Sequence, residues 1–284
     1  MSSGRPADRP RADRPPPLPE PLPGEALDSH CHLDMIGRPV AEVLADALSV
    51  GITRVVTVGC DVRSCRWAAD CAGQRTDVYA AVAIHPNETA RAAASVAGRD
   101  AVLAEIAALA ELDQVRAVGE TGLDYYRDSA EPRVQQEWFR AHIQIAKQAG
   151  KALMIHDRDA HDDVLGILDS EGAPDQVIFH CFSGDAAMAR RCADAGYVLS
   201  FAGNVTFSSA QPLRDAAAAV PADAILAETD APFLTPMPHR GKPNSPAMAA
   251  ATLRALAEVQ QMPLADLCAV VAATGERLFG PWRG

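Results

Sequence analysis

Short apolar runs rich in β-branched residues alternate along this chain with longer, alanine-rich stretches. A continuous apolar run of roughly four to eight residues is typical of a strand buried on both faces, as in a parallel sheet. Eight such runs predict strands at 27–32, 54–59, 78–84, 115–120, 152–156, 177–181, 197–201 and 224–228.

The stretches between these runs have the apolar spacing of amphipathic helices. Helices are expected at 39–50, 62–74, 100–112, 132–149, 160–170, 185–195, 209–219 and 246–260, with a last helix at 263–273. Gly150 follows one of these stretches, and Pro132 and Pro246 begin two others. Glycine commonly ends helices and proline commonly begins them, so these residues support the assigned boundaries.

Eight successive strand–helix units predict an α/β fold, the (β/α)8 TIM barrel. An open, doubly wound sheet is the alternative, but its usual glycine-rich phosphate loop is missing after the first strand. One barrel domain is therefore expected over residues 26–284. Residues 1–25 hold eight of the 21 prolines and almost no residue that could form a core. This composition predicts a disordered, polyproline-like tail.

Charge and cysteine content exclude some classes of function for this protein. The net charge of −11 disfavours a broad nucleic-acid-coating surface, because phosphate contacts rely on Lys and Arg. It allows a small metal-filled cleft, since a bound cation can dominate the local field. The seven cysteines include no Cys-x-x-Cys pair, which indicates reduced, mostly buried thiols. No apolar run has the length of a membrane span, and the chain shows no signal core, so we expect a cytoplasmic monomer without membrane contact.

Two histidines, His30 and His32, are separated by one residue in the first predicted strand, so their side chains point to the same face. Paired neutral imidazoles suit a divalent metal such as zinc, although such pairs also occur on solvated strands. Further polar residues at other strand ends favour the metal site, because active sites of barrels lie at the carboxyl ends of the strands. These residues are His85, Glu120, His156, His180 and Asp230.

This set of donors is sufficient for two divalent ions. The ions would be held by His30, His32 and Asp230, by His156 and His180, and by Glu120 as a bridge between them. Two such ions stabilise the attacking and leaving oxygens of a hydrolysis. Asp230 is also placed to take a proton from the attacking water. A metal-free acid–base pair of Glu120 and Asp230, as in a glycosidase, would leave four histidines without a role.

Five motifs contain or adjoin these residues: 28–34 (DSHCHLD), 119–126 (GETGLDYY), 180–184 (HCFSG), 228–234 (ETDAPFL) and 240–244 (RGKPN). In this order they resemble the signatures of the TatD family of metal-dependent deoxyribonucleases, from about residue 26 to residue 279. The resemblance implies a TIM-barrel hydrolase with a dinuclear centre, acting on DNA as a 3′→5′ exonuclease. By position it implies metal ligation by His30, His32, Glu120, His156, His180 and Asp230, with Asp230 as the base.

Three positions depart from the family pattern. Asn87 stands where the family often has a further histidine, Ser245 where it usually has glutamate, and Thr274 near its usual asparagine. These departures concern substrate preference rather than the metal core. The residues expected to contact substrate are His85, Tyr125, Arg158, Arg240 and Lys242. Arginine binds phosphate oxygens bidentately, and an aromatic ring can stack on a terminal base.

The first hypothesis is therefore a phosphodiesterase that trims DNA ends with Mg²⁺, Mn²⁺ or Zn²⁺. The alternative keeps the metals but changes the bond, to an ester or amide such as that of a D-aminoacyl-tRNA, so RNA or tRNA would replace DNA. Fold and metal geometry alone do not separate phosphorus from carbonyl chemistry. A binding scaffold with a vestigial site is disfavoured, because no ligand position has been lost.

Overall fold

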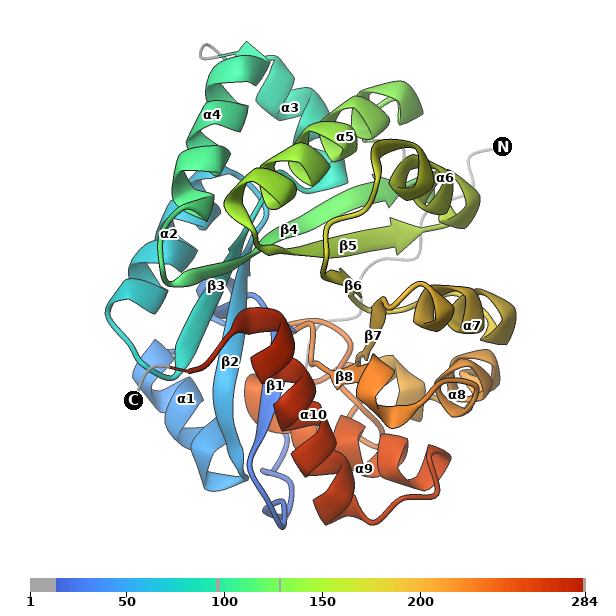
Figure 1. Ribbon diagram of the computed structural model, residues 1–284. Helices are drawn as coiled ribbons and strands as arrows, with labels where there is room; N and C mark the ends of the chain where they lie inside the picture. Colours follow the sequence, from blue (N-terminus) through green and yellow to red (C-terminus); the bar gives the residue numbers. More distant parts are fainter. Residues whose placement is uncertain (1–13, 96–97, 128, 283–284) are drawn as a thin grey trace, which may run out of the picture.

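Eight parallel strands form one sheet whose order in space follows the sequence, β1 to β8. The computed structural model describes residues 14–95, 98–127 and 129–282. Figure 1 shows the strands ringed by helices, with β4 and β5 across the ring from β1 and β8. This is the predicted (β/α)8 barrel. The strands are β1 Ala26–Cys31, β2 Ile52–Gly59, β3 Val78–Val82, β4 Val115–Asp124, β5 Ala152–Arg158, β6 Val177–Phe179, β7 Val198–Phe201 and β8 Ile225–Ala227.

The helices lie close to their predicted positions. They are α1 Val40–Ser49, α2 Val62–Gly73, α3 Thr89–Ala93, α4 Gly98–Ala110, α5 Pro132–Ala149, α6 His161–Glu171, α7 Ala186–Asp194, α8 Gln211–Ala218, α9 Ala249–Val259 and α10 Leu264–Phe279. The short α3 was not expected. The last helix runs past the predicted end at residue 273, because Leu278 and Phe279 are buried in the core and extend its apolar face.

The barrel closes where β1 meets the segment that follows β8. The backbone N–H of His32 donates to the Ala231 carbonyl (2.7 Å), and that of Asp230 donates to the His30 carbonyl (2.9 Å). Below them, the buried Asp28 carboxylate accepts bonds from the backbone N–H (2.9 Å) and the hydroxyl (2.6 Å) of Thr229. These bonds bring the end of the first strand beside the loop that follows the last.

The stretch predicted as a disordered tail is described only from residue 14; residues 1–13 lie outside the described residues. Residues 14–25 run along the barrel. Leu22 is buried and its N–H donates to the Val50 carbonyl (2.9 Å), while Arg254 donates to the carbonyls of Glu20 (2.9 Å) and Pro21 (3.1 Å). This part of the tail therefore packs with the domain, because its apolar side chain and carbonyls find partners there.

All seven cysteines are free thiols, as the sequence predicts. Among the described residues, no single helix is long and apolar enough to cross a membrane. Within the described ranges, one pair of helices, Pro246–Val259 and Leu264–Phe279, has the required length and composition when taken together, but the pair is bent by 112°.

Gly122 provides a test of the β4–β5 pairing that carries the site. It pairs with His156 and has φ +136°, and an added Cβ would lie 2.1 Å from the His156 carbonyl oxygen. We expect Gly122→Ala to lower the free energy of unfolding by about 3 kcal/mol, from strain and lost pairing, as measured by urea denaturation. Gly150→Ala is the control: its φ is also positive (+61°), but no atom lies within 4 Å of the new Cβ, so about 1 kcal/mol is expected. Equal losses in the two variants would contradict this account.

Candidate metal centre

Two strands and one loop supply the first group of donors. His30 and His32 come from the end of β1, Glu120 from β4 and Asp230 from the segment after β8. The two histidine Nε2 atoms are 3.4 Å apart. Glu120 Oε1 and Asp230 Oδ1 each lie 3.5 Å from His32 Nε2 and 3.8 Å from His30 Nε2. Donors about 2.1 Å from a tetrahedral ion are about 3.4 Å apart, so this group fits one divalent cation.

The second group shares Glu120 with the first. Glu120 Oε2 lies 2.9 Å from His180 Nε2 and 3.1 Å from His156 Nδ1, and these two nitrogens are 3.2 Å apart. His85 Nε2 is 3.6 Å from the same oxygen. The carboxylate thus presents one oxygen to each set of histidines. All six predicted ligands are brought together, and His85, predicted as a substrate contact, lies beside them.

Hydrogen bonds behind the histidines fix their orientation. His32 Nδ1 lies 3.0 Å from the Val58 carbonyl, and His180 Nδ1 lies 3.2 Å from Glu228 Oε1, which also accepts the Cys181 N–H (2.9 Å). Because these oxygens accept, the proton of each neutral ring lies on Nδ1, and the lone pair on Nε2 is the one available to an ion at the centre. This is the usual arrangement of a histidine that binds a metal.

Burial and close opposite charges compete in setting the protonation of the centre. Burial alone would raise the pKa of Glu120, but His85 and His180 outweigh it and hold that pKa well below the usual range. Burial alone would lower the pKa of His180, but Glu120 and Glu228 outweigh it and raise that pKa well above the usual value. His30 differs, because burial and the neighbouring His180 both lower its pKa. Without an ion, the centre therefore holds its carboxylate charge with protons on histidine.

Three contacts of the centre were not assigned from sequence. The Cys60 thiol at the end of β2 donates to Glu120 Oε1 (3.4 Å), and burial raises its pKa to about 12. Asp124 Oδ2 lies 3.4 Å from His156 Nε2, although no well-aligned hydrogen bond forms there, and Glu228 contacts His180. Each of the three stands at a strand end, and that position was the signal available in the sequence.

The two predicted substrate residues at the ends of β4 and β5, Tyr125 and Arg158, have different contacts. The Tyr125 hydroxyl donates to Asp163 (2.6 Å) and accepts from Gln136 (2.8 Å), so it is engaged with α5 and α6. The neighbouring Tyr126 ring is exposed, and the Arg158 guanidinium lies 4.0 Å over its centre. The exposed aromatic surface at this side of the mouth therefore belongs to Tyr126.

A second arginine–aromatic pair borders the loop after β8. Arg240 is exposed and lies 4.4 Å over the Phe207 ring. Lys242 is half-buried on the same loop. Phe233, which is 43% exposed, has its ring centre 6.1 Å from that of His32. Aromatic surface thus adjoins the donor groups on the β8 side as well as on the β4–β5 side.

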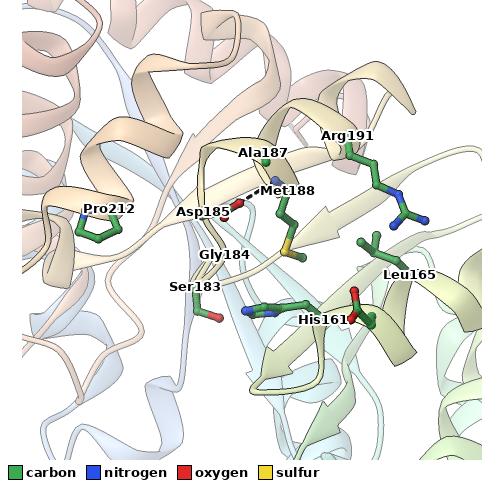
Figure 2. Close-up of a pocket in the computed structure, with 10 residues that line it drawn as sticks. His161, Leu165, Ser183, Gly184, Asp185, Ala187, Met188, Arg191 and Pro212 are labelled. Carbon is green, nitrogen blue, oxygen red and sulfur yellow. Dashed lines mark hydrogen bonds between the residues drawn. The ribbon is translucent and has the colours of Figure 1, made fainter.

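A pocket of about 550 Å³ is lined by α6, the loop after β6, α7 and Pro212 of α8 (Figure 2). Figure 2 shows His161 from α6 and Ser183 from the loop after β6 side by side at its edge. Both contact Asp157, the residue after His156: His161 Nδ1 lies 2.7 Å from its carboxylate, and the Ser183 hydroxyl donates to its carbonyl (2.9 Å). None of the candidate ligands lines this pocket.

Comparison with known proteins gives consistent matches. The family model described as TatD related DNase matches residues 27–280. The uncharacterized metal-dependent hydrolase TatD of Mycobacterium tuberculosis is 46% identical over 263 residues, covering 89% of this chain and 97% of that protein. The uncharacterized metal-dependent hydrolase YabD of Bacillus subtilis is 36% identical over 256 residues, covering 89% and 98%. The solved TatD homologue YjjV of Escherichia coli superposes with a TM-score of 0.83 at 26% identity, covering 90% and 98%.

The Glu228 carboxylate accepts a hydrogen bond from His180 and should therefore strengthen metal binding. We expect Glu228→Gln to weaken Zn²⁺ binding by about 10–100-fold, because the amide lacks the negative charge that makes the His180 imidazole a stronger ligand. Competition with a chromophoric chelator measures this. Glu258→Gln, exposed on α9, is the matched control and should bind as the wild type does. Unchanged affinity in a folded Glu228→Gln protein would show that Glu228 does not support the site.

Metal affinity should rise with pH. His180 and His156 have raised pKa values, so below these values they carry protons that an ion must displace. Each displaced proton makes binding about tenfold tighter per pH unit while the histidine is still protonated. Calorimetric titration with Zn²⁺ from about pH 6 to about pH 8, in buffers of different ionisation enthalpy, counts the released protons. An affinity that stays flat over this range would contradict the prediction.

Proposed function

Because the chain belongs to the TatD family of metal-dependent hydrolases, we propose that it is a 3′→5′ exodeoxyribonuclease that uses two divalent metal ions. The observation that best supports a two-metal mechanism is the carboxylate shared by the two groups of donors. Glu120 directs Oε1 to His30 and His32 and Oε2 to His156 and His180. Two cations held close together by a common ligand are the arrangement used for phosphodiester hydrolysis, and the family description names a DNase.

The ions, when bound, would lower the pKa of a bound water and balance the charge of the phosphate. The side chains of the protein would provide proton transfer and positioning. Asp230 reaches the donor group from the loop after β8, and its side chain stays 15% exposed, so it can accept the proton of the attacking water at its carboxylate. Glu120, almost fully buried and flanked by histidines, keeps its charge and its position.

Positive and aromatic groups at the mouth are suited to a nucleic-acid end. A guanidinium stacked on a ring, as in Arg158 on Tyr126 and Arg240 on Phe207, keeps its N–H edge for phosphate oxygens. Lys242 adds a charge on the β8 side. In a chain of net charge −11, such local groups would have to provide the attraction for DNA. Since one chain supplies every candidate ligand, we propose that it acts as a monomer, in the cytoplasm, where its thiols stay reduced.

A 5′-labelled single-stranded oligonucleotide tests the proposal. With Mg²⁺ or Mn²⁺ it should shorten one nucleotide at a time from its 3′ end. Asp230→Asn and Glu120→Gln should slow this by at least about 100-fold, because the base or the shared ligand is lost. Asp70→Asn, exposed on α2, should retain full activity.

Two outcomes would change the assignment. If the oligonucleotide stays intact while D-aminoacyl-tRNA is hydrolysed, the same centre performs carbonyl chemistry. If folded Asp230→Asn and Glu120→Gln cleave DNA at the wild-type rate, the metal mechanism is wrong.

A further inference from the structure

The sheet is irregular at the point where β4 carries Glu120 to the centre. The last residues that pair between β3 and β4 are Val82 and Val118. On the other side of β4, the pairing with β5 shifts register between Val118 and Thr121. Glu120 therefore lies beyond the last pair with β3 and inside the irregular part of the pairing with β5. Contacts from outside the sheet are needed to fix its backbone there.

His142 of α5 supplies two such contacts, and α5 packs along β4 (Figure 1). The imidazole is completely buried. The backbone N–H of Ile84, two residues beyond the end of β3, donates to His142 Nε2 (3.3 Å). A backbone N–H can only donate, so the ring proton lies on Nδ1, which donates to the Thr121 hydroxyl oxygen (2.8 Å). One ring thus joins the chain after β3 to the residue that directly follows Glu120.

Burial keeps this ring neutral, because it lowers the pKa of His142 to about 3. The two hydrogen bonds therefore persist over the whole pH range in which the centre would bind metal. A buried polar group costs free energy unless it is hydrogen-bonded, and here both ring nitrogens are. A leucine would fill the same place without that requirement. What the imidazole adds is a fixed link between two chains, as satisfied polar groups in a core do.

A second buried side chain of α5 holds β4 further along. Gln135 precedes His142 by about two helical turns, so both lie on the face of α5 that meets β4. Gln135 Oε1 accepts the backbone N–H of Asp124 (2.8 Å), and its amide donates to the Asp124 carbonyl (3.1 Å). The helix therefore fixes β4 at Thr121 and at Asp124, and at Thr121 the link continues to the chain after β3.

The position of β4 matters because the Glu120 carboxylate must reach both groups of donors. Its Oε1 lies 3.5 Å from His32 Nε2, and its Oε2 lies 2.9 Å from His180 Nε2. Ligand distances in a metal site tolerate deviations of only about 0.2 Å. A small shift of the β4 backbone would therefore take one oxygen or the other out of range.

We propose that His142 is a positioning residue for Glu120: by linking the ends of β3 and β4 it holds the carboxylate where each oxygen faces one group of donors. The proposal rests on the two-metal centre of the proposed function, but it does not depend on DNA as the substrate.

Calorimetric titration with Zn²⁺ measures the effect. His142→Leu fills the space but forms neither bond, so it should weaken binding about 10–100-fold. His142→Asn should recover part of this loss, because its amide nitrogen can take the place of Nδ1. Thr121→Val removes the acceptor on β4 and should also weaken binding. The double variant should bind no more weakly than His142→Leu, because both changes break the same link.

Ile143→Ala is the matched control, since Ile143 is equally buried on α5 but apolar. It should lower the urea midpoint of unfolding at least as much as His142→Leu does, yet leave Zn²⁺ affinity unchanged. In metal-free protein labelled with ¹⁵N-histidine, long-range proton–nitrogen spectra should show the His142 proton on Nδ1.

Four results would overturn the proposal: wild-type affinity in a folded His142→Leu protein, losses that add in the double variant, an equal loss of affinity in Ile143→Ala, or a proton on Nε2. All of these measurements are made without DNA. A wild type that binds Zn²⁺ but leaves the oligonucleotide intact would refute the nuclease and not the role of His142.

Discussion

Closure of the barrel between β1 and the loop after β8 is the constraint on which the centre depends. Asp28 and Thr229 are 201 residues apart in sequence, yet their buried hydrogen bonds join the two ends of the sheet. Directly above them, backbone bonds pair His30 and His32 with the loop that carries Asp230. Without this closure, three donors of the first group would belong to separate edges of an open sheet.

Glu120 joins the two groups of candidate donors into one centre. It comes from β4, across the ring from β1, and its carboxylate reaches both sets of histidines. A buried carboxylate costs several kcal/mol unless it is paired. Here protons on histidine, or cations in their place, provide the compensation. The same balance couples metal binding to proton release, because ions and protons occupy the centre in exchange.

The surroundings of the donors show how an acidic protein can present a site suited to an anion. Charge at the centre would come from bound cations, and guanidinium groups stacked on aromatic rings stand on two sides of the mouth. None of these features requires a basic surface, so the net charge of −11 and a phosphate-bearing substrate are compatible.

The sequence by itself determined the strand–helix alternation and the barrel, because periodicity is local. It also indicated the six candidate donors, because parallel strands must end at one pole. It did not determine which oxygen of Glu120 meets which histidines, or that Tyr126 rather than Tyr125 exposes its ring. Nor did it reveal Cys60, Asp124 and Glu228 behind the ligands, or that residues 14–25 pack on the barrel. These features depend on rotamers and on contacts between strand ends far apart in the chain. They exist only once the ring of strands has closed, so only the tertiary structure decided them.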